Sequence, residues 1–301
     1  MGKLCPGLMI KVKAFAKINL FLEVTRRRPD GYHDLATLFA RIGISDRLSL
    51  KKIAAPGIRL IVKGGPRALG RPADNIVFRA AVKFFEVFGI DPAVEIGLEK
   101  NIPVGAGLGG GSSDAAAALL GLARLYKLPR KASARLMKIA AGLGSDVPFF
   151  MLGASLAEGT GRGEKLKAIK PAGRLPYIVL VYPGAPVYTK EAYGKLRPGP
   201  VPEVALRLRA FKKLCGLIKS GGFTAESARL LFNRLETSVL PGHKAVRQAK
   251  EKLVKLGGEA VLMSGSGASV FALCRDRSKA ARIAAEIGRI RGYIIFLTKF
   301  C

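Results

Sequence analysis

The chain has 301 residues, of which 49% are hydrophobic, and its formal net charge is +30. This length allows about two domains with buried cores. Because no run reaches about 18 apolar residues, we expect no transmembrane helix and no membrane partner. Lysine and arginine are spread along the whole chain, whereas nucleic-acid-binding proteins usually concentrate them, so no specific nucleic acid is expected. We interpret the charge as a background that attracts phosphorylated ligands.

The first predicted element is a long strand over residues 10–24, because every even position in this stretch is apolar. A period of two is typical of a strand with one face in the core and one open face. Lys17 and Asn19 fall two residues apart on the open face. We therefore expect both side chains to meet solvent or a ligand.

The next signal is a turn at Arg28-Pro29-Asp30-Gly31, which Tyr32 and His33 follow. Proline, aspartate and glycine in this order are typical of a turn. Alternation of apolar residues and an apolar run then predict strands over residues 47–52, 57–62 and 94–98, with a helix over residues 75–88.

The most informative stretch is a loop of glycines and small residues that follows this last strand: Pro103, Val104, Gly105, Ala106, Gly107, Leu108, Gly109, Gly110, Gly111, Ser112 and Ser113. The Ala/Leu-rich run over residues 114–126 predicts a buried helix behind it. Glycines let the backbone approach a ligand with positive φ, so that successive N–H groups converge on an anion. The helix N-terminus adds N–H groups and a positive dipole end. The unit therefore predicts a phosphate site, with the serine hydroxyls placed to cap the helix or to contact a phosphate or a metal.

The context of this loop excludes two familiar phosphate-binding motifs. A P-loop ends in Gly-Lys-Ser/Thr, and no lysine follows these glycines. Gly105, Gly107 and Gly110 have the spacing of a dinucleotide fingerprint, but that motif needs an acidic residue about 20 residues on, at the end of a second strand. The basic stretch Pro129-Arg130-Lys131 stands there instead. A glycine-rich turn that binds nothing is the remaining alternative.

Beyond this unit, a helix is predicted over residues 132–143, followed by Gly144-Ser145-Asp146-Val147-Pro148-Phe149-Phe150. A hairpin over residues 154–158 and 164–169 comes next. The pattern restarts near Pro171, so we place the boundary between two domains there, at residues 1–170 and 171–301.

The second half alternates strands with helices. Strands are predicted over residues 177–182, 260–263, 269–274 and 293–298, and helices over residues 203–220, 225–236, 244–255 and 277–290. A second loop of small residues, 264–268, joins two of these strands. This order is typical of a split βαβ sheet with helices on one face.

The four cysteines are scattered, with no Cys-x-x-Cys pair: Cys5, Cys215, Cys274 and Cys301. This spacing is typical of reduced thiols rather than of a disulfide or zinc framework. We therefore expect a cytoplasmic protein.

Four segments together carry a family resemblance: Ala16-Lys17-Ile18-Asn19-Leu20, the 103–113 loop, residues 144–150 and Ser264-Gly265-Ser266-Gly267-Ala268-Ser269. They resemble the GHMP kinases, whose glycine loop has the form Pro-x-x-x-Gly-Leu-Gly-x-Ser-Ser, and the match spans nearly the whole chain. The resemblance implies an α+β fold, with a ribosomal protein S5 domain 2-like N-terminal domain that binds ATP and a ferredoxin-like C-terminal domain. The split βαβ order agrees with this implication.

One branch of that family is especially similar, because it shares the Lys17 strand, the Asp30-Gly31-Tyr32-His33 turn and the expanded run from Gly109 to Asp114. Its members phosphorylate the 2-hydroxyl of a methylerythritol moiety that carries a cytidine diphosphate group, in the non-mevalonate isoprenoid pathway. The resemblance implies this small-molecule substrate, ATP as co-substrate and Mg²⁺ on the ATP phosphates.

The resemblance also implies the catalytic residues. Asp146 matches the family's catalytic aspartate, which accepts the proton of the attacking hydroxyl. Lys17 resembles the cation beside it, which stabilises negative charge on the attacking oxygen. The structural alternatives are that Asp146 only caps the turn that Pro148 begins and that Lys17 is a solvated strand residue.

Substrate binding is implied for Asn19, Tyr32, His33 and Tyr193. Tyr32 and His33 line the cytosine pocket in the family, Tyr193 matches the aromatic residue that stacks on the base, and Asn19 hydrogen-bonds the substrate. The alternatives are a surface histidine and a partly buried loop tyrosine. Gly265 and Gly267 are expected to let the second loop close over the nucleotide side, or simply to make a tight turn. No protein ligand for Mg²⁺ stands out.

Two other functions remain open. A homoserine, mevalonate or sugar kinase would keep the phosphate loop but lack the base pocket. A basic RNA-binding protein would bind with a steep dependence on salt and would not need Asp146.

Overall fold

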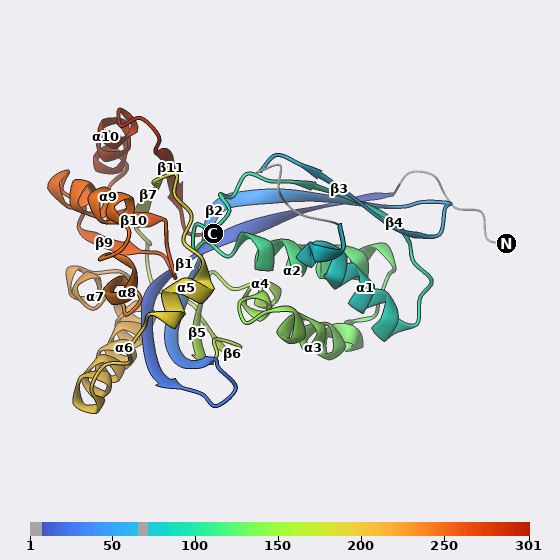
Figure 1. Ribbon diagram of the computed structural model, residues 1–301, viewed down its shortest axis with the longest axis horizontal. Helices are drawn as coiled ribbons and strands as arrows, with labels where there is room; N and C mark the ends of the chain where they lie inside the picture. Colours follow the sequence, from blue (N-terminus) through green and yellow to red (C-terminus); the bar gives the residue numbers. More distant parts are fainter. Residues whose placement is uncertain (1–7, 66–71) are drawn as a thin grey trace. The chain divides into compact units, whose positions relative to one another are not determined.

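The structure is a computed structural model that describes residues 8–65 and 72–301 (Figure 1). The chain folds into two units that interleave along the sequence. Unit 1 takes the described residues up to Ala16 together with Ser45–Val104 and Gly109–Gly153, and unit 2 takes Lys17–Ile44, Gly105–Leu108 and Ala154–Cys301. The glycine loop predicted from the sequence therefore contributes residues to both units.

Unit 1 pairs strands with a layer of helices. β3 (Gly57–Lys63) runs parallel to β4 (Ala93–Glu99), which pairs antiparallel with residues 47–52 of β2 (His33–Lys52). The helices are α1 (Ile76–Phe88), α2 (Gly110–Leu125), α3 (Ser133–Leu143) and α4 (Val147–Leu152). A Cβ built on Gly121 would lie 2.6 Å from the Leu50 side chain, so α2 approaches β2 closely enough to require glycine there.

Unit 2 contains a four-stranded antiparallel sheet made of β7 (Tyr177–Tyr182), β9 (Ala260–Met263), β10 (Val270–Cys274) and β11 (Ile294–Lys299). Its spatial order is β11-β7-β10-β9. Helices α9 (Lys244–Lys255) and α10 (Arg277–Gly288) pack together beside it (Figure 1). This order confirms the split βαβ arrangement predicted from the sequence.

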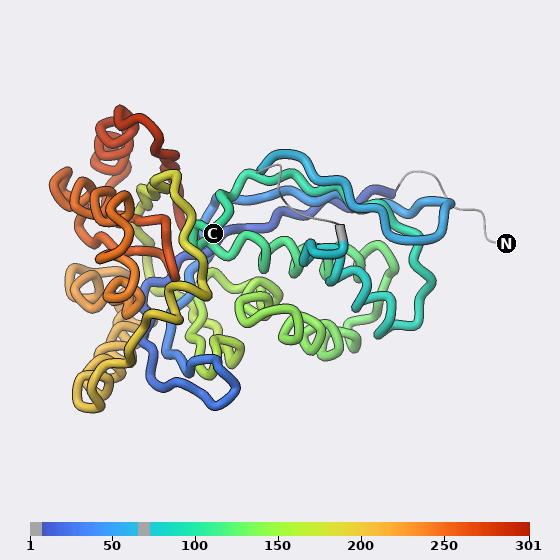
Figure 2. The backbone as a smooth tube through the Cα atoms, viewed as in Figure 1, coloured from blue at the N-terminus to red at the C-terminus, as the bar shows by residue number. Residues whose placement is uncertain are grey.

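The remaining strands of unit 2 pair with β1 (Met9–Arg27) and β2, the first two strands of the described chain, or with each other. Figure 2 shows the chain passing from β1 through a turn into β2. Residues 35–40 of β2 pair with β5 (Leu156–Gly161), which forms the predicted hairpin with β6 (Lys165–Ile169). β1 pairs in parallel with the two-residue strand β8 (Phe232–Asn233).

The prediction that the first strand has one solvent-exposed face is wrong beyond residue 15. From Ala16 to Val24 every residue of β1 is buried, and Lys17 and Asn19 are only 5% and 1% exposed. The period of two was correctly interpreted as a strand, but polar residues on its second face are covered by unit 2. Glu23 is also fully buried, where the Arg234 guanidinium donates to both of its carboxylate oxygens, at 2.8 and 2.7 Å.

Three other elements differ from the prediction. The expected helix over residues 225–236 is divided into α7 (Ala225–Arg229), β8 and α8 (Glu236–Val239). The loop expected after β7 contains the short helix α5 (Thr189–Gly194), followed by α6 (Val201–Gly221). β2 begins at His33, well before the predicted strand at residue 47. Pairing with distant strands fixes β8 and the first half of β2, and such pairing leaves no local period.

Two predictions concern the chain as a whole. In residues 8–65 and 72–301, none of the helices combines the length and the apolar character that crossing a bilayer requires. The division into domains 1–170 and 171–301 stays a prediction, since it concerns sequence domains rather than these units.

Candidate active site

Lys17 begins a chain of buried polar contacts in unit 2. Its Nζ donates to Asn19 Oδ1 at 2.8 Å, and Asn19 Nδ2 donates to Thr37 Oγ1 at 2.8 Å. Thr37, which is fully buried on β2, donates in turn to the Phe21 carbonyl at 2.7 Å. A buried ammonium needs hydrogen-bond partners, so this chain orients the lysine and the amide together. The alternative that Lys17 is a solvated strand residue is excluded.

The first glycine loop lies directly against this lysine. The Lys17 backbone N–H donates to the Leu108 carbonyl at 2.9 Å. Gly107 has φ +71°, and a Cβ built on it would lie 2.1 Å from the Ser264 carbonyl oxygen. Any larger residue would therefore separate the two loops, so Gly107 is required for their close approach.

The second loop, residues 264–268, is hydrogen-bonded to the first. Ala268 N–H donates to Gly105 O at 3.2 Å, and Ser269 N–H donates to Ala106 O at 3.1 Å. A Cβ on Gly265 would lie 3.0 Å from Lys17 Nζ. The alternative role, a tight turn between β9 and β10, is therefore present in its backbone, whereas closure over the nucleotide side stays a prediction.

In unit 1, the glycine run starts α2 earlier than predicted. The helix begins at Gly110, and its N-cap is Gly109, with φ 68° and no side chain to cap it. Ser112 and Ser113 therefore lie inside the first turn, and the expectation that either caps the helix is wrong. Ser113 is 2% exposed. The first N–H groups of a helix lack intrahelical acceptors, and glycines leave them accessible to an anion.

The segment that carries Asp146 lies next to this helix start. Asp146 occupies the N-cap position of α4, but its side chain makes no capping hydrogen bond. The alternative that Asp146 serves only as a cap is therefore excluded. A Cβ built on Gly144 would lie 3.9 Å from Ser112 Oγ, so the segment that carries Asp146 and the first turn of α2 are neighbours within unit 1.

A buried cluster of charges, which the sequence analysis missed, supports the same helix start. Lys100 Nζ donates to Asp114 Oδ2 at 2.6 Å and to Asp46 Oδ2. Asp46 is fully buried and also accepts the N–H of Ile102 at 2.8 Å. A Cβ on Gly110 would lie 3.4 Å from Lys100 Nζ, so the cluster ties the end of β4 to the first turn of α2.

Burial sets the protonation of this cluster. It raises the pKa of Asp114 to about 8; the neighbouring Asp46 carboxylate adds to this effect, and Lys100 opposes it. Burial acts against the charge of Lys100, but Asp114 and Asp46 hold its pKa above the ordinary value. Within the described parts of the chain, Asp114 Oδ1 has no hydrogen-bond partner. Burial therefore favours the state in which Lys100 and Asp46 are charged and Asp114 is protonated over the state in which all three side chains are charged.

The predicted base-binding residues meet in unit 2. The rings of His33 and Tyr193 lie 5.3 Å apart between centroids, with 34° between their planes. Tyr32 is 53% exposed, and the Arg162 guanidinium lies 4.9 Å from its ring centroid. Burial, and to a lesser degree the charge of Arg27, lowers the pKa of His33, so its imidazole is neutral near pH 7. The geometry brings this pair of rings together, and their role stays a prediction.

The turn that carries these residues is held by charged hydrogen bonds. Arg28 donates to Asp30 Oδ1 at 3.1 Å and to Asp34 Oδ1 at 3.0 Å, and Tyr32 N–H donates to Asp30 Oδ1 at 3.1 Å. Gly31 supplies the positive φ of 81° that the turn requires. Tyr32 and His33 are thus presented by an ordered turn.

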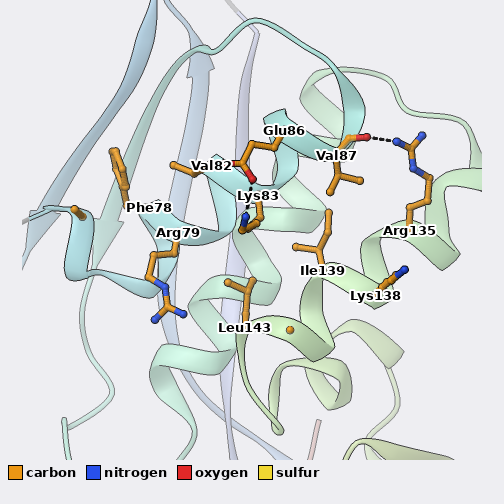
Figure 3. A pocket seen from close by; sticks show the side chains of 12 residues that line it. Phe78, Arg79, Val82, Lys83, Glu86, Val87, Arg135, Lys138, Ile139 and Leu143 are labelled. Carbon is orange, nitrogen blue, oxygen red and sulfur yellow. Dashed lines mark hydrogen bonds and ion pairs between the residues drawn. The ribbon is translucent and has the colours of Figure 1, made fainter.

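Unit 1 also has a cavity that belongs to none of this chemistry. It has a volume of about 670 Å³ and lies between α1 and α3, over apolar side chains that include Phe78, Ile139 and Leu143 (Figure 3). At its edge Lys83 pairs with Glu86 at 2.7 Å, and Arg135 donates to the Val87 carbonyl. No residue predicted to bind or react lines this cavity.

Two family descriptions match this chain: "GHMP kinases N terminal domain" over residues 75–154 and "GHMP kinases C terminal" over residues 216–294. A protein of Pelotomaculum thermopropionicum named 4-diphosphocytidyl-2-C-methyl-D-erythritol kinase is 40% identical over 296 residues, which are 97% of this chain and 99% of that protein. A protein of Exiguobacterium sibiricum with the same name is 42% identical over 279 residues, 92% of this chain and 93% of that protein.

Solved structures show the same relationship. A crystal structure of 4-(cytidine 5'-diphospho)-2C-methyl-D-erythritol kinase has a TM-score of 0.76 at 34% identity, covering 97% of this chain and 100% of that one. Homoserine kinase from Cytophaga hutchinsonii also has a TM-score of 0.76, but at 18% identity, covering 100% of this chain and 97% of that one. The second likeness concerns the fold alone.

Proposed function

Because this chain belongs to the GHMP kinase family and has its two-domain fold, we propose that it phosphorylates 4-diphosphocytidyl-2-C-methyl-D-erythritol. The γ-phosphoryl group of ATP is transferred to the 2-hydroxyl of the substrate, a step of the non-mevalonate isoprenoid pathway. The observation that carries the proposal is the environment of Lys17: a buried ammonium, bonded to Asn19, beneath the backbone of both glycine loops.

The reaction assigns one role to each of the two charged residues. Asp146 accepts the proton of the 2-hydroxyl while the oxygen attacks the γ-phosphorus and ADP leaves. Lys17 is its cationic partner and stabilises the negative charge that develops on the attacking oxygen. Lys17 belongs to unit 2 and Asp146 to unit 1, so their partnership rests on the proposal and is tested below. The closeness of the Asp146 segment to Ser112, in the first turn of α2, supports a chemical role.

The glycine loop, residues 103–113, holds the phosphates of ATP. The positive φ angles of Gly105, Gly107 and Gly109 bring the backbone close to a ligand, and the start of α2 adds N–H groups. Mg²⁺ neutralises the phosphate charge. In the parts of the chain described, no cluster of three or more His, Cys, Asp or Glu side chains could hold a metal ion. We therefore expect Mg²⁺ to enter with the nucleotide, bound mainly by its phosphates.

The cytidine end of the substrate binds at Tyr32, His33 and Tyr193. A planar base gains roughly 1–3 kcal/mol by stacking on an aromatic ring. The neutral imidazole of His33 offers one hydrogen-bond donor and one acceptor to the base edge. The contact between His33 and Tyr193 supports this assignment and favours a cytidine substrate over homoserine, mevalonate or a sugar. The proposed location is the cytoplasm.

A coupled assay of ADP release tests the proposal. The purified protein is given ATP and Mg²⁺ with the cytidine-linked substrate, homoserine, mevalonate or galactose in turn. We expect turnover with the first acceptor at a kcat/KM at least roughly a hundredfold above the others. A higher kcat/KM for another acceptor would identify a different member of the family. Tight RNA binding without turnover of any acceptor would support the RNA-binding alternative.

A further inference from the structure

The second glycine loop depends on a side chain that neither the sequence motifs nor the proposed reaction uses. Asn233 ends the two-residue strand β8 and is 2% exposed. β8 pairs with β1 at Phe21 and Leu22, a few residues beyond Lys17 on the same strand. Asn233 is thus fixed to the strand that carries the proposed catalytic lysine.

Both polar atoms of the Asn233 side chain, Nδ2 and Oδ1, are hydrogen-bonded. Its Nδ2 donates to the carbonyl oxygens of Met263 and Gly265, both at 2.8 Å, and its Oδ1 accepts the N–H of Leu235 at 3.0 Å. The two carbonyls settle the orientation of the amide, since only the –NH₂ end can donate to them. A buried amide with every group satisfied specifies one backbone arrangement around it.

The two carbonyls are those of Met263, the last residue of β9, and of Gly265, a loop residue close to the lysine. A Cβ on Gly265 would lie 3.0 Å from Lys17 Nζ and 3.2 Å from Asn19 Oδ1. The backbone that Asn233 holds is therefore in contact with the polar end of Lys17. The Asn233 amide thus fixes the direction of the Gly265 carbonyl beside this lysine.

We propose that Asn233 is a positioning residue for the phosphoryl transfer: by fixing the Gly265 carbonyl, it keeps the second loop and the Lys17 ammonium in their reactive arrangement. This inference rests on the proposed function, because it assumes that Lys17 acts on the acceptor oxygen. It predicts an effect on kcat rather than on binding, since the Asn233 side chain is hydrogen-bonded to Met263, Gly265 and Leu235, which belong neither to the 103–113 loop nor to the base-binding rings.

The test uses Asn233→Asp in the full-length protein. This change keeps the acceptor for Leu235 and the shape of the side chain, but it replaces the –NH₂ group with an oxygen that faces two carbonyl oxygens. We expect kcat to fall at least roughly tenfold, with KM for ATP and acceptor within about twofold. Protonation restores one donor, so the kcat of the variant relative to wild type should rise as the pH is lowered from 8 to 6. Loss of a fold-stabilising contact alone would not produce this recovery in protein that is fully folded at the assay temperature.

Two further variants keep the test decisive if Asn233→Asp folds poorly. Gly265→Ala places a Cβ 3.0 Å from Lys17 Nζ and 3.1 Å from the Gly107 carbonyl oxygen, at a φ of +53° that alanine rarely adopts, and we expect the same loss in kcat. Its matched control is Gly173→Ala, which shares a positive φ (+68°) but where a Cβ meets nothing within 4 Å, and kcat should stay within twofold. Ile283→Val, in the core of α10, measures the effect of lower stability alone and should leave kcat within twofold.

The outcomes separate this inference from the proposed function. Wild-type turnover of the cytidine substrate tests the function, and Lys17→Met tests the role of the lysine. If Lys17→Met abolishes turnover while Asn233→Asp and Gly265→Ala keep wild-type kcat, the positioning role is wrong and the function stands. If Lys17→Met keeps wild-type turnover, the assignment of Lys17 fails, and this inference fails with it. A fall in kcat for Asn233→Asp with no recovery at lower pH would also overturn the positioning role.

Discussion

Lys17 and Lys100, two lysines whose side chains are buried, differ in their partners. Lys100 lies between Asp46 and Asp114, and all three residues are in unit 1. Lys17 donates to the neutral amide of Asn19, and its proposed carboxylate, Asp146, belongs to the other unit. A cluster completed within one unit stabilises that unit.

The glycine loop connects these two lysines. Leu108 contacts the backbone of Lys17, and Gly110 lies close to the ammonium of Lys100. The comparison therefore predicts that substitutions around Lys17 affect mainly turnover, whereas substitutions around Lys100 affect mainly stability.

The largest expected effect is that of Asp146→Asn. Removing the proton acceptor should lower kcat at least roughly a hundredfold, within the usual range for acid–base catalysis, while ATP binding measured by calorimetry stays nearly unchanged. The matched control is Asp276→Asn, because Asp276 caps α10 through a 2.6 Å bond from Lys279 N–H and asparagine caps equally well. Near-normal turnover of Asp146→Asn would show that another group takes the proton.

Substitutions in the cluster around Lys100 should lower the stability of the protein, and by different amounts at Asp46 and at Asp114. Asp46→Asn places an amide –NH₂ either against the Lys100 ammonium or against the N–H of Ile102, so we expect a loss of about 3 kcal/mol in the free energy of unfolding. Asp114→Asn resembles the protonated acid and should cost less than about 1 kcal/mol at pH 7. Denaturant unfolding measures both values. Equal losses for the two variants would contradict the assignment of the proton to Asp114.

Asp114 also makes the stability of the folded protein depend on pH. The pKa of Asp114 is raised from 3.8 to about 8 in the folded protein, so the folded state binds a proton that the unfolded state releases between these values. The stability from this proton is complete below about pH 4 and is lost as the pH rises through 8. Wild type should therefore be more stable, relative to Asp114→Asn, at pH 5 than at pH 8. A constant difference would contradict the raised pKa.

A smaller effect is expected at the base-binding residues. Tyr193→Leu removes the ring that faces His33, and we expect KM for the cytidine substrate to rise roughly tenfold with little change in kcat. The neighbouring Tyr188, which is 67% exposed, supplies the control Tyr188→Leu with unchanged kinetics. If KM is unchanged in Tyr193→Leu, the base binds elsewhere.

The sequence predicted what local pattern and motif determine. The helix at residues 244–255 and the strands at residues 177–182 and 260–263 have the predicted bounds. The strand–loop–helix unit around Gly107 was also predicted, because glycine spacing is a local signal. The burial of Lys17 was not predicted, since what covers the second face of β1 comes from distant segments of unit 2.

Residues that act through distant partners escaped the sequence analysis. Asn233 lay inside an expected helix, because its pairing with β1 spans more than 200 residues of chain. The carboxylate Asp46 and the amine Lys100 are 54 residues apart and form no spaced motif. Asp46 precedes one predicted strand and Lys100 follows another, but neither position identifies the partner.

The central claim is that Lys17 and Asp146 act together on one acceptor oxygen, and a double-mutant cycle on kcat tests it most directly. We expect Lys17→Met and Asp146→Asn each to lower kcat at least roughly a hundredfold. The kcat of the double variant should be at most about tenfold below that of the less active single variant. If instead the two losses multiply in the double variant, to roughly ten-thousandfold, the residues act independently and the proposed partnership is wrong.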